Sequence, residues 1–262
     1  MARMSELGAV IIADNTDKFD YIKLAGIAAG KVKKHLGIPV ALITSDDVTD
    51  GFDHIIKTGY SRDNKRLLER NAVEWRNLNR TKAYDLTPFD RTLLIDADYL
   101  INNDALLSHC LSDFDFAIAK NLYDPATGSA YTLPLGKSKI EQLWATIMIF
   151  NKCDLAAKIF AMAEHVLEHY LYYSKLYQFN SFPLRNDYAF TIACHLMGGY
   201  GQTDFSLRHH SMFNCDFNTE IEQLNDDDVL ISYNKTESKK HVQRLKNVDI
   251  HIQNKLTLFE KI

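Results

Sequence analysis

The sequence predicts an α/β protein with a mostly parallel central sheet flanked by helices, and three features support this prediction. Short apolar runs of strand length occur at Gly8–Ala13, Pro39–Thr44 and Thr92–Ile95, which is typical of strands buried on both faces. An amphipathic segment of helical period, Phe19–His35, separates the first two runs. A strand, a helix and a strand at this spacing form a βαβ unit, whose strands are parallel.

The composition sets the broad class of protein. The chain has 262 residues, of which 46% are hydrophobic and 24% are charged, and this suits one large globular domain. The net charge of −4 gives no global basic field that would indicate a polyanionic partner. The four cysteines lie far apart without a Cys-x-x-Cys pair, which favours buried reduced thiols.

The chain shows no targeting or membrane-spanning pattern. Its first apolar run, Gly8–Ala13, is too short for the core of a signal peptide. No segment approaches the roughly 18 apolar residues that a bilayer-spanning helix needs. We therefore expect a cytoplasmic protein (in the host cytoplasm if it is viral) with no membrane partner.

The rest of the chain is expected to contain further strands, helices and surface segments. Ser61–Leu86 is a charged stretch, mostly a solvated helix face, Asn121–Lys139 is a loop beside the active rim, and Lys239–Lys246 is a basic surface segment. The other elements expected are strands at His54–Lys57, Asp115–Ala119, Leu143–Phe150, Val229–Ser232 and Val248–Lys255, a helix from Asp154 to about Tyr173, and a helix that begins at Asn186 or Asp187.

Asp96 and Asp98 follow the strand Thr92–Ile95 directly. In an extended chain this spacing turns both side chains to one side, roughly 6–7 Å apart. Two unpaired carboxylates at the end of a buried strand repel each other and are costly to bury. A hard divalent cation such as Mg²⁺ or Mn²⁺ removes both penalties. The pair therefore predicts a metal site, although Asp-x-Asp also occurs at loops and helix caps.

Other polar residues are expected near this pair. Ligands of open α/β sheets bind at the carboxyl ends of the strands, which places Asp14, Asn15 and Asp46 on the same rim, unless they are simply turn formers. Arg76 and Lys82 are further candidates for binding the donor, because their helix leads directly into the strand before Asp96.

Thr81-Lys82, the apolar strand and Asp96-Ala97-Asp98 together resemble the glycogenin-like (family 8-type) branch of the GT-A fold glycosyltransferases. The resemblance is densest at Gly8–Asn15, Thr81–Ile101 and Asp249–Lys255. It implies one nucleotide-diphospho-sugar transferase domain over residues 1–262. Residues 1–101 would bind the nucleotide, and residues 102–262 would bind the acceptor and end in a metal-ligand strand.

The resemblance also implies roles for single residues. Asp96 and Asp98 would hold Mn²⁺ or Mg²⁺ on the diphosphate of the donor, with His251 as the third ligand, and an imidazole favours Mn²⁺. The other implied roles are Lys255 at the leaving diphosphate, Lys82 at the sugar nucleotide, Asp14 and Asn15 at uracil and ribose, Phe19 or Tyr21 as the stacking aromatic, and Asp187 as a catalytic carboxylate beside the transferred sugar.

Plainer interpretations stay open, with His251 a structural histidine, Asp187 a helix N-cap and Lys255 an exposed lysine. The chain also departs from the family. The segment His251–Lys255 is shorter and lacks a glycine, and Asp187-Tyr188 replaces an Asp-Gln pair, which leaves the sugar open. Trp144-Ala145-Thr146 replaces Asn-Ser-Gly, so the acceptor side is rebuilt.

The expected function is metal-dependent transfer of a hexosyl or pentosyl group from a UDP-sugar to an acceptor hydroxyl, with retention of anomeric configuration. The acceptor is a glycan, a protein, a small molecule or hydroxymethylated viral DNA, and DNA binding would weaken steeply with salt. One alternative is a sugar-1-phosphate nucleotidyltransferase. Its Gly-rich loop is missing, because Asp14–Phe19 contains no glycine. The other alternative is a non-catalytic binder of nucleotide sugar or nucleic acid.

Overall fold

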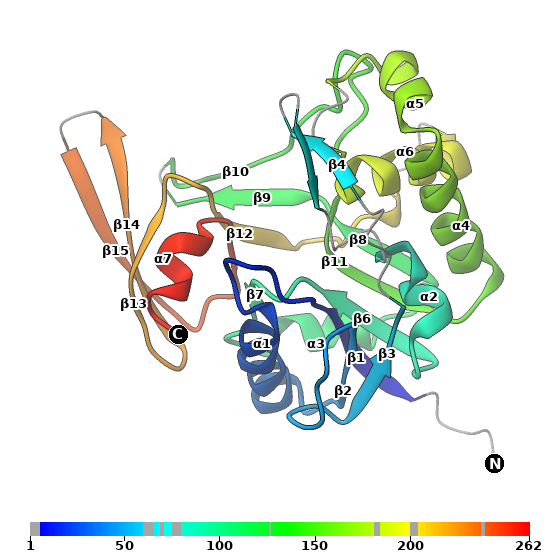
Figure 1. Cartoon of the computed structure of the whole chain (residues 1–262). Helices are drawn as coiled ribbons and strands as arrows, with labels where there is room; N and C mark the ends of the chain where they lie inside the picture. The colour runs from blue at the N-terminus through cyan, green and yellow to red at the C-terminus, as the bar shows by residue number, and fades with distance from the viewer. Residues whose placement is uncertain are drawn as a thin grey trace.

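The main sheet has six strands in the order β3–β2–β1–β6–β11–β8 in the computed structural model of the chain (Figure 1). The first four strands of this order run parallel, whereas β11 runs antiparallel to both β6 and β8. Helices flank the sheet, so the predicted α/β class is confirmed. The strands are β1 (Leu7–Ile12), β2 (Val40–Thr44), β3 (His54–Lys57), β6 (Arg91–Ile95), β8 (Phe116–Ala119) and β11 (Trp144–Asn151).

The structure describes residues 6–59, 65–68, 71–74, 80–125, 127–180, 184–199, 204–236 and 239–262. Within this part of the chain, no helix combines the length and the apolar character needed to cross a membrane. The helices are α1 (Tyr21–Leu36), α2 (Ala83–Leu86), α3 (Ala105–Cys110), α4 (Asp154–Glu168), α5 (Tyr170–Tyr177), α6 (Asn186–Gly198) and α7 (Lys255–Phe259).

The buried strands of the main sheet place hydrophobic side chains on both of its faces. Ala9 and Ile11 of β1 share one hydrophobic cluster with α1, whereas Val10 and Ile12 share a second cluster with α4 and α6. Side chains that alternate along a strand point to opposite faces, so a continuous apolar run fits a sheet covered on both sides. This explains why β1 and β2 carry no polar side chain until they reach their carboxyl ends.

Helix α1 begins and ends where its sequence provides caps. The Asp20 side chain accepts a hydrogen bond from the backbone N–H of Lys23 (2.9 Å), which satisfies a free donor of the first turn. At the other end Gly37 has φ +65°, a left-handed conformation that glycine adopts without a steric penalty. The helix therefore returns the chain to β2 at a defined point.

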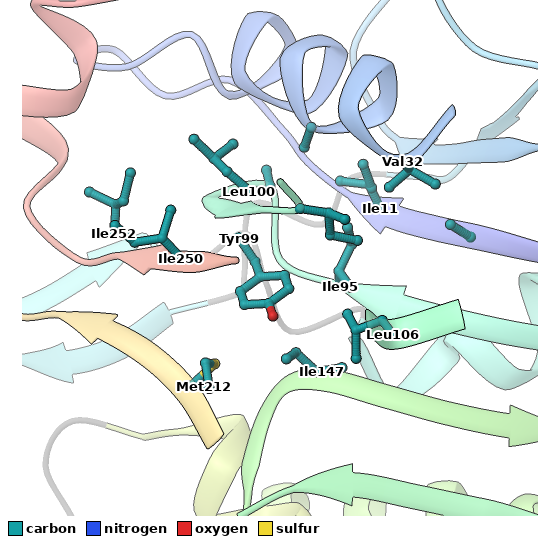
Figure 2. Packing of buried hydrophobic residues seen from close by; sticks show 14 of the residues in the cluster. Ile11, Val32, Ile95, Tyr99, Leu100, Leu106, Ile147, Met212, Ile250 and Ile252 are labelled. Atoms are coloured by element: carbon teal, nitrogen blue, oxygen red, sulfur yellow. The ribbon is translucent and has the colours of Figure 1, made fainter. Parts of the chain in front are cut away.

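A second sheet, in the order β10–β9–β12–β16–β7, lies beside the main one. It continues from β6, because β7 follows after three residues that include Asp96 and Asp98. Figure 2 shows Ile95 and Ile147 of the main sheet close to Tyr99 of β7 and Met212 of β12, in one buried cluster. The strands are β7 (Tyr99–Leu100), β9 (Asn121–Asp124), β10 (Ser129–Tyr131), β12 (Ser211–Cys215) and β16 (Ile250–Ile252).

A third, antiparallel sheet consists of β13 (Glu220–Leu224), β14 (Asp228–Thr236) and β15 (Lys239–Lys246), seen at the left of Figure 1. The segment predicted as a basic surface stretch is therefore a strand, and carboxylates neutralise part of its charge. Lys240 pairs with Glu220 at 2.8 Å, and Arg244 pairs with Asp228 at 2.6 Å.

Several local predictions were wrong. The charged stretch predicted as helix contains the hairpin β4 (Lys65–Leu68)–β5 (Asn71–Glu74), and the predicted loop Asn121–Lys139 contains β9 and β10. The helix from Asp154 breaks at His169 (φ −109°, ψ 31°), which separates α4 from α5. The last predicted strand is shortened to β16 and is followed by α7. Strands of three or four residues are too short to show a clear period, and this explains most of these errors.

Candidate functional site

Asp96, Asp98 and His251 converge at the carboxyl end of β6. One possible ligand atom from each residue lies within 4.8 Å of the other two. Strand pairing produces this convergence, because β16 runs antiparallel to β7 with His251 opposite Tyr99. The backbone N–H of Ile252 donates to the carbonyl of Asp98 at 3.0 Å. The structure thus brings together the three residues predicted to hold a metal.

Asn214 determines which nitrogen of His251 faces the carboxylates. It lies opposite His251 on the neighbouring parallel strand β12, and its Oδ1 is 2.9 Å from His251 Nδ1. The Gln253 side-chain amide donates to the same oxygen at 3.0 Å, so we assign that oxygen as the acceptor and His251 Nδ1 as protonated. His251 Nε2, 3.5 Å from Asp98 Oδ1, then carries a lone pair toward the cluster, as in metal sites whose histidine is oriented by a hydrogen bond.

Asp98 is an ionised carboxylate between two basic groups. Its Oδ2 pairs with the ammonium of Lys255, which also donates to the carbonyl of Ile252. Burial raises the pKa of the Asp98 carboxyl, but the positive charge of the neighbouring Lys255 ammonium opposes that effect, and the pKa lies below its usual range. Asp98 Oδ1 is buried without a hydrogen-bond partner, and this atom is available to a cation.

Arg80 orients Asp96 and was not found by sequence reasoning. Only 1% of its surface is exposed, its Nη1 donates to Asp96 Oδ1 at 2.7 Å, and its Nη2 donates to the carbonyl of Ala145. Burial raises the pKa of the Asp96 carboxyl, and the charge of Arg80 opposes this rise. The sequence offered no signal that separates Arg80 from the other basic residues of its charged stretch.

The structure does not bring Lys82 to the cluster. Its ammonium pairs with Glu164 of α4 at 2.5 Å, and 45% of its side chain is exposed. The predicted contact of Lys82 with the sugar nucleotide stays a prediction, and Arg80, two residues earlier, is the cation beside Asp96. Arg76, another predicted donor contact, lies outside the described residues.

Asp187 joins the same network from the first turn of α6. Its Oδ1 accepts from the backbone N–H of Ala145 at 2.9 Å, and its Oδ2 pairs with Arg185 at 2.9 Å. The Ala145 carbonyl accepts from Arg80, so the backbone of this one residue connects Asp187 to Arg80 and Asp96. The negative charge of Asp187 also contributes to the raised pKa of Asp96. Helix α6 begins at Asn186, as the sequence predicted, and the residue at its N-cap is Arg185 and not Asp187.

Arg185 lies between two aromatic rings. Its guanidinium carbon is 5.6 Å from the ring centroid of Trp144 and 5.2 Å from that of Tyr188. Cations in this position are attracted to the ring faces. The Arg185 guanidinium, which also pairs with Asp187, therefore contacts both rings.

Asp14, Asn15 and Asp46 gather at the carboxyl ends of β1 and β2, on the rim that also carries Asp96. Asp14 Oδ1 accepts from the Ser45 backbone N–H at 2.5 Å and from Thr44 Oγ1 at 3.1 Å. Asp46 Oδ2 accepts from the Asn15 backbone N–H at 2.5 Å. These bonds connect the two strand ends, and contact of the three residues with a nucleotide stays a prediction.

The predicted stacking aromatics contact a residue of α7 that the sequence did not single out. The Phe259 ring stacks on Phe19 (centroids 4.9 Å apart, planes at 21°) and meets Tyr21 edge to face at 5.7 Å. Because α7 also carries Lys255, this short helix connects the loop after β1 with Asp98.

No protein-family model matches the sequence, and a search of curated proteins finds no match. Glycosyltransferases are among the solved structures that this chain resembles. Glycosyltransferase GlyE of Streptococcus pneumoniae TIGR4 has a TM-score of 0.46 at 14% identity, with 78% of this chain and 45% of GlyE covered. Galactosyltransferase LgtC, in complex with donor and acceptor sugar analogs, has a TM-score of 0.47 at 15% identity, with 71% and 69% covered.

The chain thus spans about 45% of the length of GlyE. The bifunctional glycosyltransferase WbbM has a TM-score of 0.38 at 15% identity. Because every one of these scores is below 0.5, a function for this chain has to be argued from its own side chains.

Proposed function

We propose that the chain is a metal-dependent GT-A glycosyltransferase that transfers a sugar from a UDP-sugar to an acceptor hydroxyl. The observation that supports this function best is the convergence of Asp96, Asp98 and His251 within 4.8 Å. A cation from the protein, Lys255, lies directly beside them. Leaving diphosphates need positive charge of this kind, because negative charge accumulates on them as the bond between the anomeric carbon and the phosphate oxygen breaks.

The donor set fits Mn²⁺ or Mg²⁺. Two carboxylates supply hard oxygen ligands, and one neutral imidazole moves the preference toward Mn²⁺. Asp98 Oδ1, which is buried and accepts no hydrogen bond, and His251 Nε2, which Asn214 turns toward the cluster, are the two atoms best prepared for it. Once bound, the cation would neutralise charge on the diphosphate of the donor.

The side chains of the chain itself account for orientation and charge in the transfer. Lys255 would contact the leaving diphosphate once the cation has taken its place on Asp98. Arg80 holds Asp96 in one rotamer by its bonds to the Asp96 carboxylate and the Ala145 carbonyl. Asp187, fixed by Arg185 and Ala145, would bind hydroxyls of the transferred sugar and stabilise positive charge on its ring.

A panel of nucleotide sugars tests the proposal before any acceptor is known. The protein is incubated with each donor and Mn²⁺, and released nucleoside diphosphate is measured. We expect slow hydrolysis of UDP-sugars that EDTA and Asp98→Asn both abolish, while Asp98→Asn remains folded by circular dichroism. The anomeric proton of the released sugar, read by NMR at early times, then tests retention.

The same panel separates the alternatives. Pyrophosphate released from UTP and a sugar 1-phosphate would identify a nucleotidyltransferase and contradict our proposal. A rise in melting temperature with Mn²⁺ and a UDP-sugar, without turnover under any condition, would instead identify a binder. For the acceptor, DNA containing hydroxymethylated bases is compared with glycans, proteins and small molecules. If DNA is the acceptor, its binding to the protein should weaken steeply between about 50 and 200 mM salt.

A further inference from the structure

A second group of metal-ligating side chains lies on the opposite side of the main sheet from α1, at the end of α4. His165, Glu168 and His169 each offer one ligand atom, and these atoms lie within 4.8 Å of one another. All three side chains are exposed to solvent. None of them takes part in the site around Asp98.

Helix geometry brings the three side chains together. Residues three and four positions apart lie on the same face of a helix, and Glu168 and His169 follow His165 by three and four positions. The backbone N–H of His169 donates to the carbonyl of His165 at 3.1 Å, so the last turn of α4 is formed. The two imidazole rings are 4.5 Å apart at 58°, and neither ring lies flat on the other.

We propose that His165, Glu168 and His169 bind a transition-metal cation such as Zn²⁺. Two imidazoles and one carboxylate suit Zn²⁺ far better than Mg²⁺, which prefers oxygen ligands only. At Zn–N and Zn–O distances of about 2.1 Å, tetrahedral ligand atoms are about 3.4 Å apart. The exposed side chains reach this spacing by rotating their χ angles, and water completes the coordination.

The position of the site gives the cation a structural role. His169 is the C-cap of α4 and the N-cap of α5, so a cation bound by His165 and His169 ties the last turn of α4 to the start of α5. Tyr177 at the end of α5 is 2.7 Å from His195 Nδ1 of α6 through its hydroxyl. The metal would therefore fix the junction between α4 and α5. These two helices pack near α6, which carries Asp187 in its first turn.

Zinc titration of the ¹⁵N-labelled full chain tests this site without reference to sugar transfer. Imidazole resonances are followed by NMR, with His165→Asn, His169→Asn and, as a matched control, His54→Asn, which removes another exposed histidine. We expect the His165 and His169 signals to shift together and saturate together. Each of the two variants should weaken zinc binding at this site at least tenfold, and the control should leave it unchanged.

Two results would overturn the proposal. One is that the His165 and His169 signals do not move at a several-fold excess of Zn²⁺. The other is that both variants, with helical circular dichroism like that of the parent chain, bind zinc as tightly as it does. Neither result bears on the transferase proposal, because Mn²⁺ and nucleotide sugars are not part of this experiment.

Discussion

Asn214→Leu should weaken Mn²⁺ binding without touching any proposed ligand. Asn214 is 6% exposed, and its Oδ1 accepts from both His251 Nδ1 and Gln253 Nε2. Leucine removes this acceptor, so His251 loses the bond that orients Nε2 toward Asp98. Loss of such a bond typically lowers metal affinity 10–100-fold, which corresponds to about 1.4–2.7 kcal/mol of binding free energy.

Electron paramagnetic resonance of free Mn²⁺ measures this affinity directly. Asn214→Asp keeps an acceptor for His251 Nδ1 and should bind Mn²⁺ at least as tightly as the parent chain does. Asn234→Leu, a change of the same kind at an exposed position of β14, serves as the control and should have no effect. If Asn214→Leu binds Mn²⁺ with unchanged affinity while it remains folded, His251 is not oriented by Asn214 for a metal.

Three further changes test other parts of the structure. Lys255→Ala should lower kcat for donor cleavage up to about a hundredfold, since a lysine about 4 Å from a phosphate contributes on the order of 4 kcal/mol before desolvation. Lys18→Ala, which removes an exposed lysine, is the control. An equal loss of kcat in Lys18→Ala would contradict the role assigned to Lys255. Arg80→Met should lower the free energy of unfolding in urea by about 3–5 kcal/mol, because it removes the buried partner of an ion pair and leaves the partly buried Asp96 carboxylate unpaired. A loss below about 1 kcal/mol would show that Arg80 does not stabilise the strand end. Burial, with a smaller contribution from His109, lowers the pKa of His210 to about 4. The neutral His210 therefore gives its full contribution to the free energy of unfolding above about pH 6.5, and this free energy decreases by about 3 kcal/mol as the pH falls to 4. If His210→Leu leaves the pH dependence of the free energy of unfolding unchanged, this reasoning is refuted.

The sequence was sufficient to predict the buried strands of the main sheet and α1. These elements have either a continuous apolar run or a 3.6-residue period, with Gly37 and Asp20 at the helix ends, and the structure agrees with each of them within a few residues. The short strands β9 and β10 and the short helix α7 have no such period. Their formation depends on partners that are distant in the sequence, such as β12 for β9.

The candidate site could be predicted only where a residue type carries its own chemical signal. Asp96 and Asp98 stand out because two carboxylates end a buried strand, and the resemblance pointed to His251. Arg80 and Asn214 act through contacts that tertiary structure creates, and nothing in their local sequence distinguishes them. The sequence could not show which of two nearby cations, Lys82 or Arg80, lies beside Asp96. The packing of the chain decides this, because Arg80 is buried and Lys82 is partly exposed.

The most direct test of the central claim is the position of the metal. Crystals grown with Mn²⁺ and UDP, measured near the manganese absorption edge, give an anomalous difference map that locates the ion without reference to any assigned role. We expect a peak bound by Asp98 and His251 Nε2, with Asp96 beside it and the Lys255 ammonium moved from Asp98 to the diphosphate. A manganese peak elsewhere, with Lys255 still paired to Asp98 and UDP bound, would contradict the proposed function.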